Sequence, residues 1–483
     1  MGIDAAVLEE KLAALECARE WSPRLVAKLE VLLHTPDEAA LVRVNPLSFA
    51  REKGVAQAEA LDLFLHAARV GLFTLDWHLL CPSCGAAVES FASLRTLHQH
   101  FFCSMCNLQV EANLDDYIQV SFTVAPAVRG IRFHDVDSLS AEDYLFKLRY
   151  TREMRVHPDG PPLVDVLRTI MKVVTWVQPG ERHQASFEAS EGAFSAVEFQ
   201  AHTGAICMVT PGASATRVDF DIGDSEMTVS SPAVRPGRVD FSVHNRRATP
   251  VVFALAFKST EDAAGHKPAV LAPIVTGAML LTNHTFRRLF RSETVHGAEG
   301  ISVRDVTVLF TDLKGSTALY ERIGDLKAFS LVHQHFERLS AAVQANSGAI
   351  VKTIGDAVMA AFQRPIDAVR AALEMQTQID AFNHEHGAHD IVLKIGIHRG
   401  PSIAVTMNDN LDYFGQTVNV AARVQGLADA NEIWVTDDVY RAEGISGLLA
   451  RVESQDASLR GIQKQVRVHK AVRSDSTLPG GHL

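Results

Sequence analysis

Two acidic residues, Asp312 and Asp356, stand where the chain could gather ligands for a metal ion. Asp312 ends the β-branched run VTVLFTD, and Asp356 lies in the turn of AIVKTIGDAVMAAF, residues 349–362, which has the pattern of a β-hairpin. If the strands are neighbours in one sheet, both carboxylates converge at the same end of it. Such hard oxygen ligands suit Mg²⁺ or Mn²⁺. Taken singly, each aspartate is equally typical of a helix cap or a turn.

The segment LKGST, which follows Asp312 directly, is suited to hold an anion. Its glycine and small side chains allow backbone N–H groups and a helix N-terminus to face a phosphate. The segment consists of Leu313, Lys314, Gly315, Ser316 and Thr317. Residues 303–440 contain 11 lysines and arginines against 17 aspartates and glutamates. Phosphate binding in this acidic region therefore requires divalent cations that bridge carboxylate and phosphate.

A third polar group lies in LDYFGQTVNVAARV, which begins at residue 411. Asn419 and Arg423 are four residues apart and share one helical face, and Asp412 precedes them. Lys352 stands only four residues before Asp356, in the first strand of the predicted hairpin. Alone, the segment after Asp412 is typical of a capped helix with solvated polar residues.

The elements that must position these residues alternate regularly from residue 303 onward. A strand is followed by an amphipathic helix with apolar residues from Leu326 to Val343, by the hairpin at 349–362, by a helix at 366–383 and by the strand IVLKIGI. This β-α-β-β-α-β order predicts a ferredoxin-like domain within a multidomain α+β protein.

At this point four motifs resemble, in order and spacing, those of the catalytic domain of class III adenylate and guanylate cyclases. They are FTDLKGST, VKTIGDAVMAAF, GIHRG and DYFGQTVNVAAR, in a region that covers about a third of the chain. The resemblance implies a homodimer in which the active site forms between two cyclase domains and uses two-metal-ion catalysis. One subunit would supply the metal ligands Asp312 and Asp356.

The resemblance further implies that the other subunit supplies Lys352 and Asp412 to read the purine. That same subunit would supply Asn419, which would orient the ribose, and Arg423, which would offset charge on the α-phosphate through its planar donors. Near the C-terminus the family usually has a phosphate-binding lysine in an LKG motif, whereas this chain reads LRG, with Arg460. Because a cation is retained, we expect altered phosphate geometry without loss of activity.

The choice of purine follows from donors and acceptors. The ammonium of Lys352 can donate to N1 of adenine, and the carboxylate of Asp412 can accept from the exocyclic N6 amine. Guanine presents N1–H and O6 instead, so both contacts would be mismatched. Guanylate cyclases of this family typically carry Glu and Cys at these places. The sequence therefore predicts an adenylate cyclase that converts ATP to cyclic AMP and pyrophosphate.

Four cysteines form a separate candidate metal site. CPSC and CSMC, with 18 residues between them, have the spacing of a zinc ribbon. The ligands would be Cys81, Cys84, Cys103 and Cys106, a closed shell that makes the Zn²⁺ structural. His98 and His100 lie between the pairs as alternative ligands, although surface or packing roles suit them better.

The remaining segments define the predicted domain organisation. We expect a helical region at 1–80, the zinc ribbon at 81–116, a β-rich regulatory domain with the pattern of a sandwich or barrel at 117–260, a linker with a short helix at 261–302, the cyclase domain at 303–473 and a disordered tail at 474–483. The N-terminal half faintly resembles the regulatory extension of some bacterial cyclases and names no ligand. Arg287, Arg288 and Arg291 fit a solvated helix face better than a hinge.

The overall charge limits the classes of partner. A formal net charge of −11 disfavours nucleic acid and anionic membranes, and an acidic N-terminal region opposes the reading as a DNA-binding regulator. The N-terminus has no apolar signal region, and the longest apolar run, residues 269–281, is too short to span a membrane, so we expect a cytoplasmic protein. The alternatives to an adenylate cyclase are a catalytically weak nucleotide-binding signalling module and a guanylate cyclase.

Overall fold

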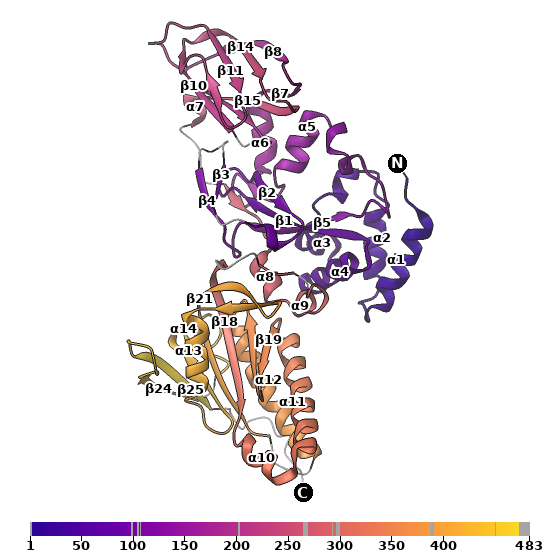
Figure 1. The fold of residues 1–483 in the computed structure, drawn as a ribbon, viewed down its shortest axis with the longest axis vertical. Coiled ribbons are helices and arrows are strands. Elements are labelled where there is room, and N and C mark those ends of the chain that lie inside the picture. The colour runs from indigo at the N-terminus through magenta and orange to yellow at the C-terminus, as the bar shows by residue number, and fades with distance from the viewer. Residues whose placement is uncertain are drawn as a thin grey trace. The chain divides into compact units, whose positions relative to one another are not determined.

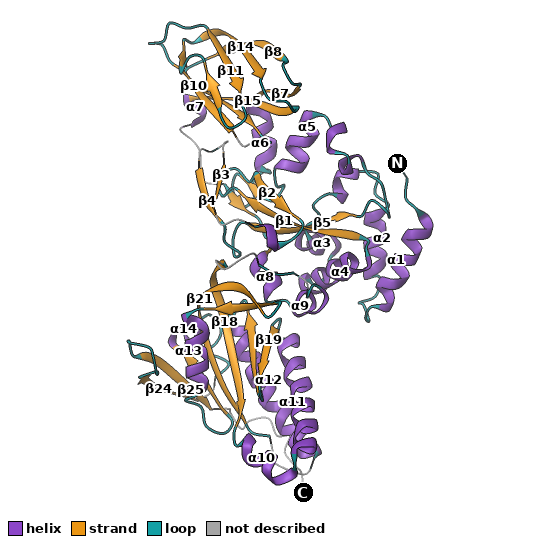
Figure 2. Ribbon diagram, viewed as in Figure 1, coloured by secondary structure: helices purple, strands orange, loops and turns teal. Residues whose placement is uncertain are grey.

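A computed structural model of the chain divides into two compact units (Figures 1 and 2). The structure describes residues 2–472 except 98–99, 104–105, 107, 201–202, 264–268, 292, 296–299, 387–390 and 450. The first unit comprises residues 1–92, 98–112 and 117–275, and the second comprises residues 93–97, 113–116 and 276–483. The predicted tail at 474–483 and His98 lie outside the described residues. Within the described part of the chain, no helix is both long and apolar enough to cross a membrane.

The first unit begins with helices. They are α1 (Ala5–Cys17), α2 (Leu25–Leu33), α3 (Pro46–Lys53) and α4 (Gln57–Val70). The helical region predicted for residues 1–80 ends earlier, because Gly71 adopts the left-handed conformation (φ 88°) that terminates α4. Strand β1 (Phe73–Leu80) follows, in a segment whose Phe, Thr and Trp favour extended backbone.

Strand β1 is the centre of a small antiparallel sheet. It pairs with β2 (Ala87–Phe91) on one side and with β5 (Ile118–Val124) on the other. Between β2 and β5, the strands β3 (His100–Cys103) and β4 (Leu108–Glu111) form a separate hairpin. The cysteine pairs therefore lie at the end of β1 and at the turn of this hairpin.

Two packed β-sheets make up residues 171–259 of the first unit. One has the order β13-β10-β9-β15-β7 and the other β12-β11-β14-β8. The strands are β7 (Met171–Val177), β8 (Arg182–Ala189), β9 (Gly192–Glu198), β10 (Thr203–Val209), β11 (Arg217–Ile222), β12 (Met227–Val229), β13 (Ala233–Val234), β14 (Gly237–Asn245) and β15 (Val251–Ser259). Alternate side chains of both sheets share one core, in which Phe220, Phe241 and Phe253 are buried.

The β-rich region is shorter than the predicted 117–260. Between β5 and β7 the chain forms short helical turns, the two-residue strand β6 (Met154–Arg155) and helix α6 (Leu163–Ile170). This stretch contains the proline- and glycine-rich segment PDGPP at 158–162. Proline supplies no ladder donor and glycine weakens a strand, so extended pairing does not begin until residue 171.

The second unit is built around an eight-stranded sheet. Seven of its strands have the order β19-β20-β18-β21-β23-β25-β24, and the eighth, β22, pairs with β21. Its first half runs β18 (Ile301–Leu313), α10 (Ser316–Ile323), α11 (Asp325–Ala345), β19 (Ala349–Ile354), β20 (Ala357–Phe362), α12 (Pro365–Glu385) and β21 (Leu393–Met407). The second half runs β22 (Asn410–Phe414), α13 (Gln416–Gln425), β23 (Glu432–Thr436), α14 (Asp437–Tyr440), β24 (Arg451–Ala457) and β25 (Val466–Val472).

The core of the second unit lies on both faces of this sheet. On one face, the apolar sides of α11 and α12 pack on β18, β20 and β21, with Leu339, Met375 and Ile395 buried. On the other face, Val420 and Val424 of α13 pack against Trp434 of β23. Because the sheet is packed on both faces, the ends of its central strands are held rigidly. The candidate site residues lie at such strand ends.

A short connecting region precedes β18. It contains α8 (Gly277–Leu281) and α9 (His284–Leu289), so Arg287 and Arg288 lie on the predicted short helix while Arg291 lies beyond its end. Residues 113–116 also belong to the second unit. The N–H of Leu114 donates to Ser302 O, and the carbonyl of Leu114 accepts from Ala278 N.

Candidate active site

The two aspartates predicted to bind metal lie at the same end of the central sheet. Thr311 of β18 is opposite Val358 of β20, whose N–H donates to the Thr311 hydroxyl at 3.1 Å. Asp312 follows Thr311, and Asp356 precedes Val358 by two residues in the β19–β20 turn, which Gly355 makes possible with φ 61°. The two carboxylates are therefore brought to one edge of the sheet.

Electrostatics at this edge favour a cation. Burial raises the pKa of Asp312, and the charge of Asp356 raises it further, while Lys394 opposes the shift. Asp356 also has a buried carboxylate oxygen, Oδ2, without a hydrogen-bond partner among the described residues. A buried carboxylate oxygen that lacks a donor and stands near a second carboxylate has the chemistry of a divalent-cation ligand. The residues present thus fit a Mg²⁺ or Mn²⁺ site.

Lys352 and Asp412 form a direct ion pair within one chain. Lys352 Nζ lies 2.6 Å from Asp412 Oδ2, and the other carboxylate oxygen of Asp412 accepts from Tyr413 N at 2.8 Å. The Asp412 side chain is 8% exposed and that of Lys352 is 36% exposed. The carboxylate is thus fixed by two donors, while the ammonium keeps access to solvent and retains two further N–H groups.

Asn419 and Arg423 lie on the exposed side of α13, one turn apart. The helix is held close to the sheet by Gly396 of β21, where an added Cβ would lie 2.1 Å from Gln425 N. The side chains of Asn419 and Arg423 form no hydrogen bond or ion pair with the described residues. Both polar side chains therefore point away from the core and are available to a ligand.

The predicted anion-binding segment connects β18 to α10. Leu313 is buried, so only its backbone can serve a ligand. Gly315 has φ 74° and precedes the first residue of α10, Ser316, without a side-chain cap. The Lys314 ammonium pairs with Asp429. Backbone N–H groups at this helix start are therefore free of a capping side chain, as anion binding requires; Thr317 is the second residue of α10.

Arg460 is exposed in the turn between β24 and β25. It makes no ion pair within the described residues. No hydrogen bond or ion pair joins Arg460 to Asp312 or Asp356 of the same chain.

Two cations near the site were not assigned to it from the sequence. Lys394 of β21 has its ammonium 4.0 Å from Asp312 Oδ2, and it is the only charged residue in the apolar strand IVLKIGI, a signal that could have marked it. Arg287 of α9 donates to the carbonyls of Leu281 and Leu411, the latter being the neighbour of Asp412. Burial lowers the pKa of Arg287, so this residue is not part of a solvated face; nothing in its spacing indicated this.

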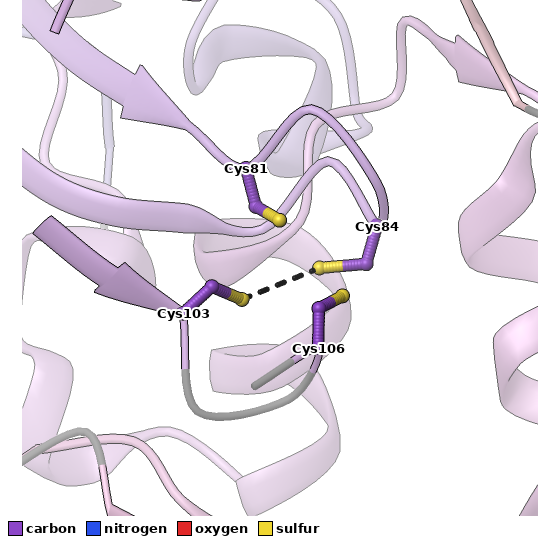
Figure 3. Close-up of side chains that lie close together, drawn as sticks. All are labelled: Cys81, Cys84, Cys103 and Cys106. Atoms are coloured by element: carbon purple, nitrogen blue, oxygen red, sulfur yellow. Dashed lines mark hydrogen bonds between the residues drawn. The ribbon is translucent and has the colours of Figure 1, made fainter. Parts of the chain in front are cut away.

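The four cysteines come together in the first unit (Figure 3). Their sulfur atoms all lie within 4.8 Å of one another, and the Sγ atoms of Cys84 and Cys103 are 3.8 Å apart. Sulfurs around a tetrahedral zinc ion are separated by about 3.8 Å, given Zn–S bonds of about 2.3 Å. The cluster therefore fits a Cys₄ zinc site, whereas His100 is exposed at the start of β3.

Comparison with known proteins identifies two regions. Residues 8–288, more than half of the chain, match a family described as "Family of unknown function (DUF5939)". Residues 300–470 match the "Adenylate and Guanylate cyclase catalytic domain".

Individual relatives match only part of the chain. The chain is 34% identical over 182 residues to an adenylate cyclase of Anabaena cylindrica, and 30% identical over 138 residues to adenylate cyclase 1 of Rhizobium meliloti. These alignments cover 35% and 26% of this chain, but only 35% and 21% of the two relatives. The crystal structure of the adenylyl cyclase CyaB from P. aeruginosa is 22% identical with a TM-score of 0.34, covering 38% of this chain and 100% of that one.

Proposed function

Because the chain belongs to the family DUF5939 and carries an adenylate and guanylate cyclase catalytic domain at residues 300–470, we propose that it is an adenylate cyclase that makes cyclic AMP and pyrophosphate from ATP. The observation that carries the choice of ATP is the ion pair of Lys352 and Asp412. We further propose that the β-α-β-β-α-β part of the second unit is ferredoxin-like.

The choice of adenine rests on the atoms that the pair presents. Lys352 can donate one of its remaining N–H groups to adenine N1, and Asp412 can accept from the N6 amine with a lone pair that neither Lys352 nor Tyr413 uses. With guanine, the ammonium would meet the N1–H donor and the carboxylate would meet the O6 acceptor. Such mismatches at a mostly buried carboxylate are strongly unfavourable.

The carboxylates of Asp312 and Asp356 are proposed to hold two Mg²⁺ or Mn²⁺ ions. When bound, these ions make the ribose 3′-hydroxyl more acidic and offset charge on the phosphates. The protein's own part is to keep two carboxylates close together at a sheet edge although they repel each other. Lys394 reduces this repulsion, because its ammonium lies 4.0 Å from Asp312 Oδ2.

Other residues would position the triphosphate. The backbone N–H groups of Gly315 to Thr317 are proposed to face the phosphates, because the N–H of Lys314 already donates to Val392 O at 2.9 Å. Arg460 is proposed to bind the phosphates in place of the family's lysine. Asn419 would hold the ribose, and Arg423 would donate to the α-phosphate oxygens as negative charge develops on them.

The site is proposed to be completed by a second copy of the chain. Lys352 and Asp412 lie together on one part of the domain, and in the family the metal ligands that act with them come from the other subunit. Each homodimer would then have two equivalent sites. The first unit, with a structural zinc ribbon at the four cysteines, is proposed to regulate this assembly.

The deciding experiment is cyclic nucleotide production by the purified full chain, with ATP or GTP and with Mg²⁺ or Mn²⁺. We expect cyclic AMP from ATP, and loss of this activity in the Asp356→Ala variant because a metal ligand is removed. Cyclic GMP as the main product would instead indicate a guanylate cyclase. No product under any of these conditions would contradict an enzymatic function and favour a nucleotide-binding module.

A further inference from the structure

A cavity of about 310 Å³ in the first unit has a strongly basic lining. It lies beside α3 and the segment at 147–155, far in sequence from the cyclase domain. The basic residues that line it are Arg43, Arg51, Lys53, Lys147, Arg152 and Arg155, whereas its acidic residues are Glu52 and Glu153. Its volume falls in the range of small-molecule sites, roughly 300–1,000 Å³.

The protein's carboxylates offset the six cations only in part, since Glu153 attracts Arg43 and Arg152 without a direct ion pair. None of them forms an ion pair with a carboxylate of the described residues, and their hydrogen bonds go to neutral groups. Arg152 donates to Ala39 O at 2.7 Å, and Arg155 donates to Gly160 O at 2.8 Å. Arg51 and Arg152 are exposed, whereas the other four cations are half-buried. Because half-buried charges in proteins are usually paired, four unpaired ones around one cavity leave room for an anion.

Arg43 is held in place at the inner side of this cavity. Its guanidinium donates to Leu148 O at 2.8 Å and to the Gln119 side chain at 3.0 Å. Its backbone adopts φ 51°, a left-handed conformation that is costly for a residue other than glycine. A strained backbone that fixes a half-buried guanidinium among neutral acceptors is typical of a ligand-binding position.

Arg43 is also surrounded by like charges. Burial, together with the charges of Arg149 and Arg152, lowers the pKa of Arg43 to about 9. Asp76 and Glu153 act in the opposite direction with less effect. An anion in the cavity would relieve this repulsion, since it would be attracted by all three guanidinium groups.

The geometry points to a binding site in the DUF5939 region for a small organic anion that carries phosphate or carboxylate groups. Arginine presents planar pairs of N–H donors that match either group. The cavity also contains apolar side chains, among them Phe49 and Val44, and neutral polar side chains such as Ser48 and Thr151. This mixture suits a ligand with an anionic end and a carbon skeleton better than a bare inorganic ion.

The test is isothermal titration of the full chain with three separate probes: inorganic phosphate, glucose 6-phosphate and succinate. No Mg²⁺ or Mn²⁺ is added, so the carboxylates of the cyclase domain repel the probes instead of binding them through cations. We expect at least one probe to bind with a Kd of about 1 mM or tighter. Binding of glucose 6-phosphate alone identifies a phosphate ester, and binding of succinate alone identifies a carboxylate. Binding of inorganic phosphate as well identifies the anion itself as the main determinant.

The double variant Arg51→Glu with Lys147→Glu reverses two charges of the lining at side chains that are not fully buried. It should weaken binding by about tenfold or more, because charge-assisted contacts are replaced by repulsion. The matched control is Arg238→Glu, whose side chain is 73% exposed and lies outside the cavity; it should leave the Kd unchanged. The proposal is overturned if none of the probes binds at about 10 mM, or if the double variant and the wild type have the same Kd.

Discussion

The ammonium of Lys352 lies 2.6 Å from the carboxylate of Asp412, although the two residues are 60 positions apart in the chain. Lys352 is on β19, at the edge of the sheet, and Asp412 is on β22, which is added beside β21. A donor and an acceptor are thus fixed side by side before any nucleotide binds. If the pair reads a purine as proposed, the protein does not have to order both side chains when the base binds, which favours both affinity and selectivity.

Exchange of this pair should change the purine that is used. In the double variant Lys352→Glu with Asp412→Cys, the carboxylate can accept from guanine N1–H and the thiol can donate to O6. We expect kcat/KM for ATP to fall by about 100-fold or more, and the ratio of GTP to ATP turnover to rise, because buried mismatches discriminate strongly. The measurement is steady-state production of cyclic AMP and cyclic GMP, with Arg238→Glu, an exposed position of the first unit, as a control. An unchanged ratio would show that Lys352 and Asp412 do not read the base.

A complementation experiment tests whether each site needs two subunits. Asp356→Ala and Arg423→Ala should each be inactive, because one lacks a metal ligand and the other lacks the cation at the α-phosphate. When the two variants are mixed in equal amounts, half of the dimers should be heterodimers with one intact site. About a quarter of wild-type activity should then return. A mixture as inactive as its components would contradict a shared site.

The motifs for this site could be read from the sequence because each of them depends on local order. Asp312 follows a β-branched strand and Asp356 occupies a glycine turn, so strand pairing alone brings them together at one sheet edge. The spacing of the cysteine pairs similarly anticipated a cluster, since each C-x2-C pair needs only a tight turn. In both cases the sequence neighbours of the functional residues largely determine where the side chains go.

Contacts between distant segments could not be predicted in this way. The bond from Arg287 to the carbonyl of Leu411 joins two positions that share no periodic pattern, and the guanidinium is buried by packing that only the tertiary structure defines. The six cations of the basic cavity come from several separate elements. Strand β1 was not predicted, because the apolar run before it has helical spacing. The end of helix α4 depends on a single glycine, Gly71.

The zinc content of the chain can be measured directly. We expect one zinc ion per chain by native mass spectrometry, lost in Cys84→Ser because a closed tetrahedral shell needs all four thiolates. Cys17→Ser is the matched control, since Cys17 is exposed and lies outside the cluster. Removal of zinc by a chelator should lower the melting temperature of the first unit, as structural zinc contributes about 10 kcal/mol or more in small zinc domains. A chain that binds no zinc and melts unchanged would refute the zinc ribbon.

A buried histidine makes the stability of helix α11 depend on pH. His335 is 0% exposed, its Nδ1–H donates to Val332 O at 2.5 Å, and its Nε2 has no partner among the described residues. Burial lowers the pKa of His335 from 6.5 to about 4. The folded state therefore keeps this ring neutral while the unfolded chain takes up a proton below pH 6.5, so stability is lost as the pH falls from 6.5 toward 4.

The loss can be located by hydrogen exchange of peptides from α11 at pH 7 and pH 5. At pH 5 the opening free energy of the helix should be about 2 kcal/mol lower than at pH 7 because of His335 alone. His335→Phe should remove this difference, since a phenyl ring does not titrate and can keep the contact with Phe336, whose ring centroid lies 4.5 Å from that of the imidazole. The control is His333→Gln in the same helix, because His333 is 63% exposed. If His335→Phe leaves the pH dependence of α11 as large as in the wild type, the proton uptake belongs to another group.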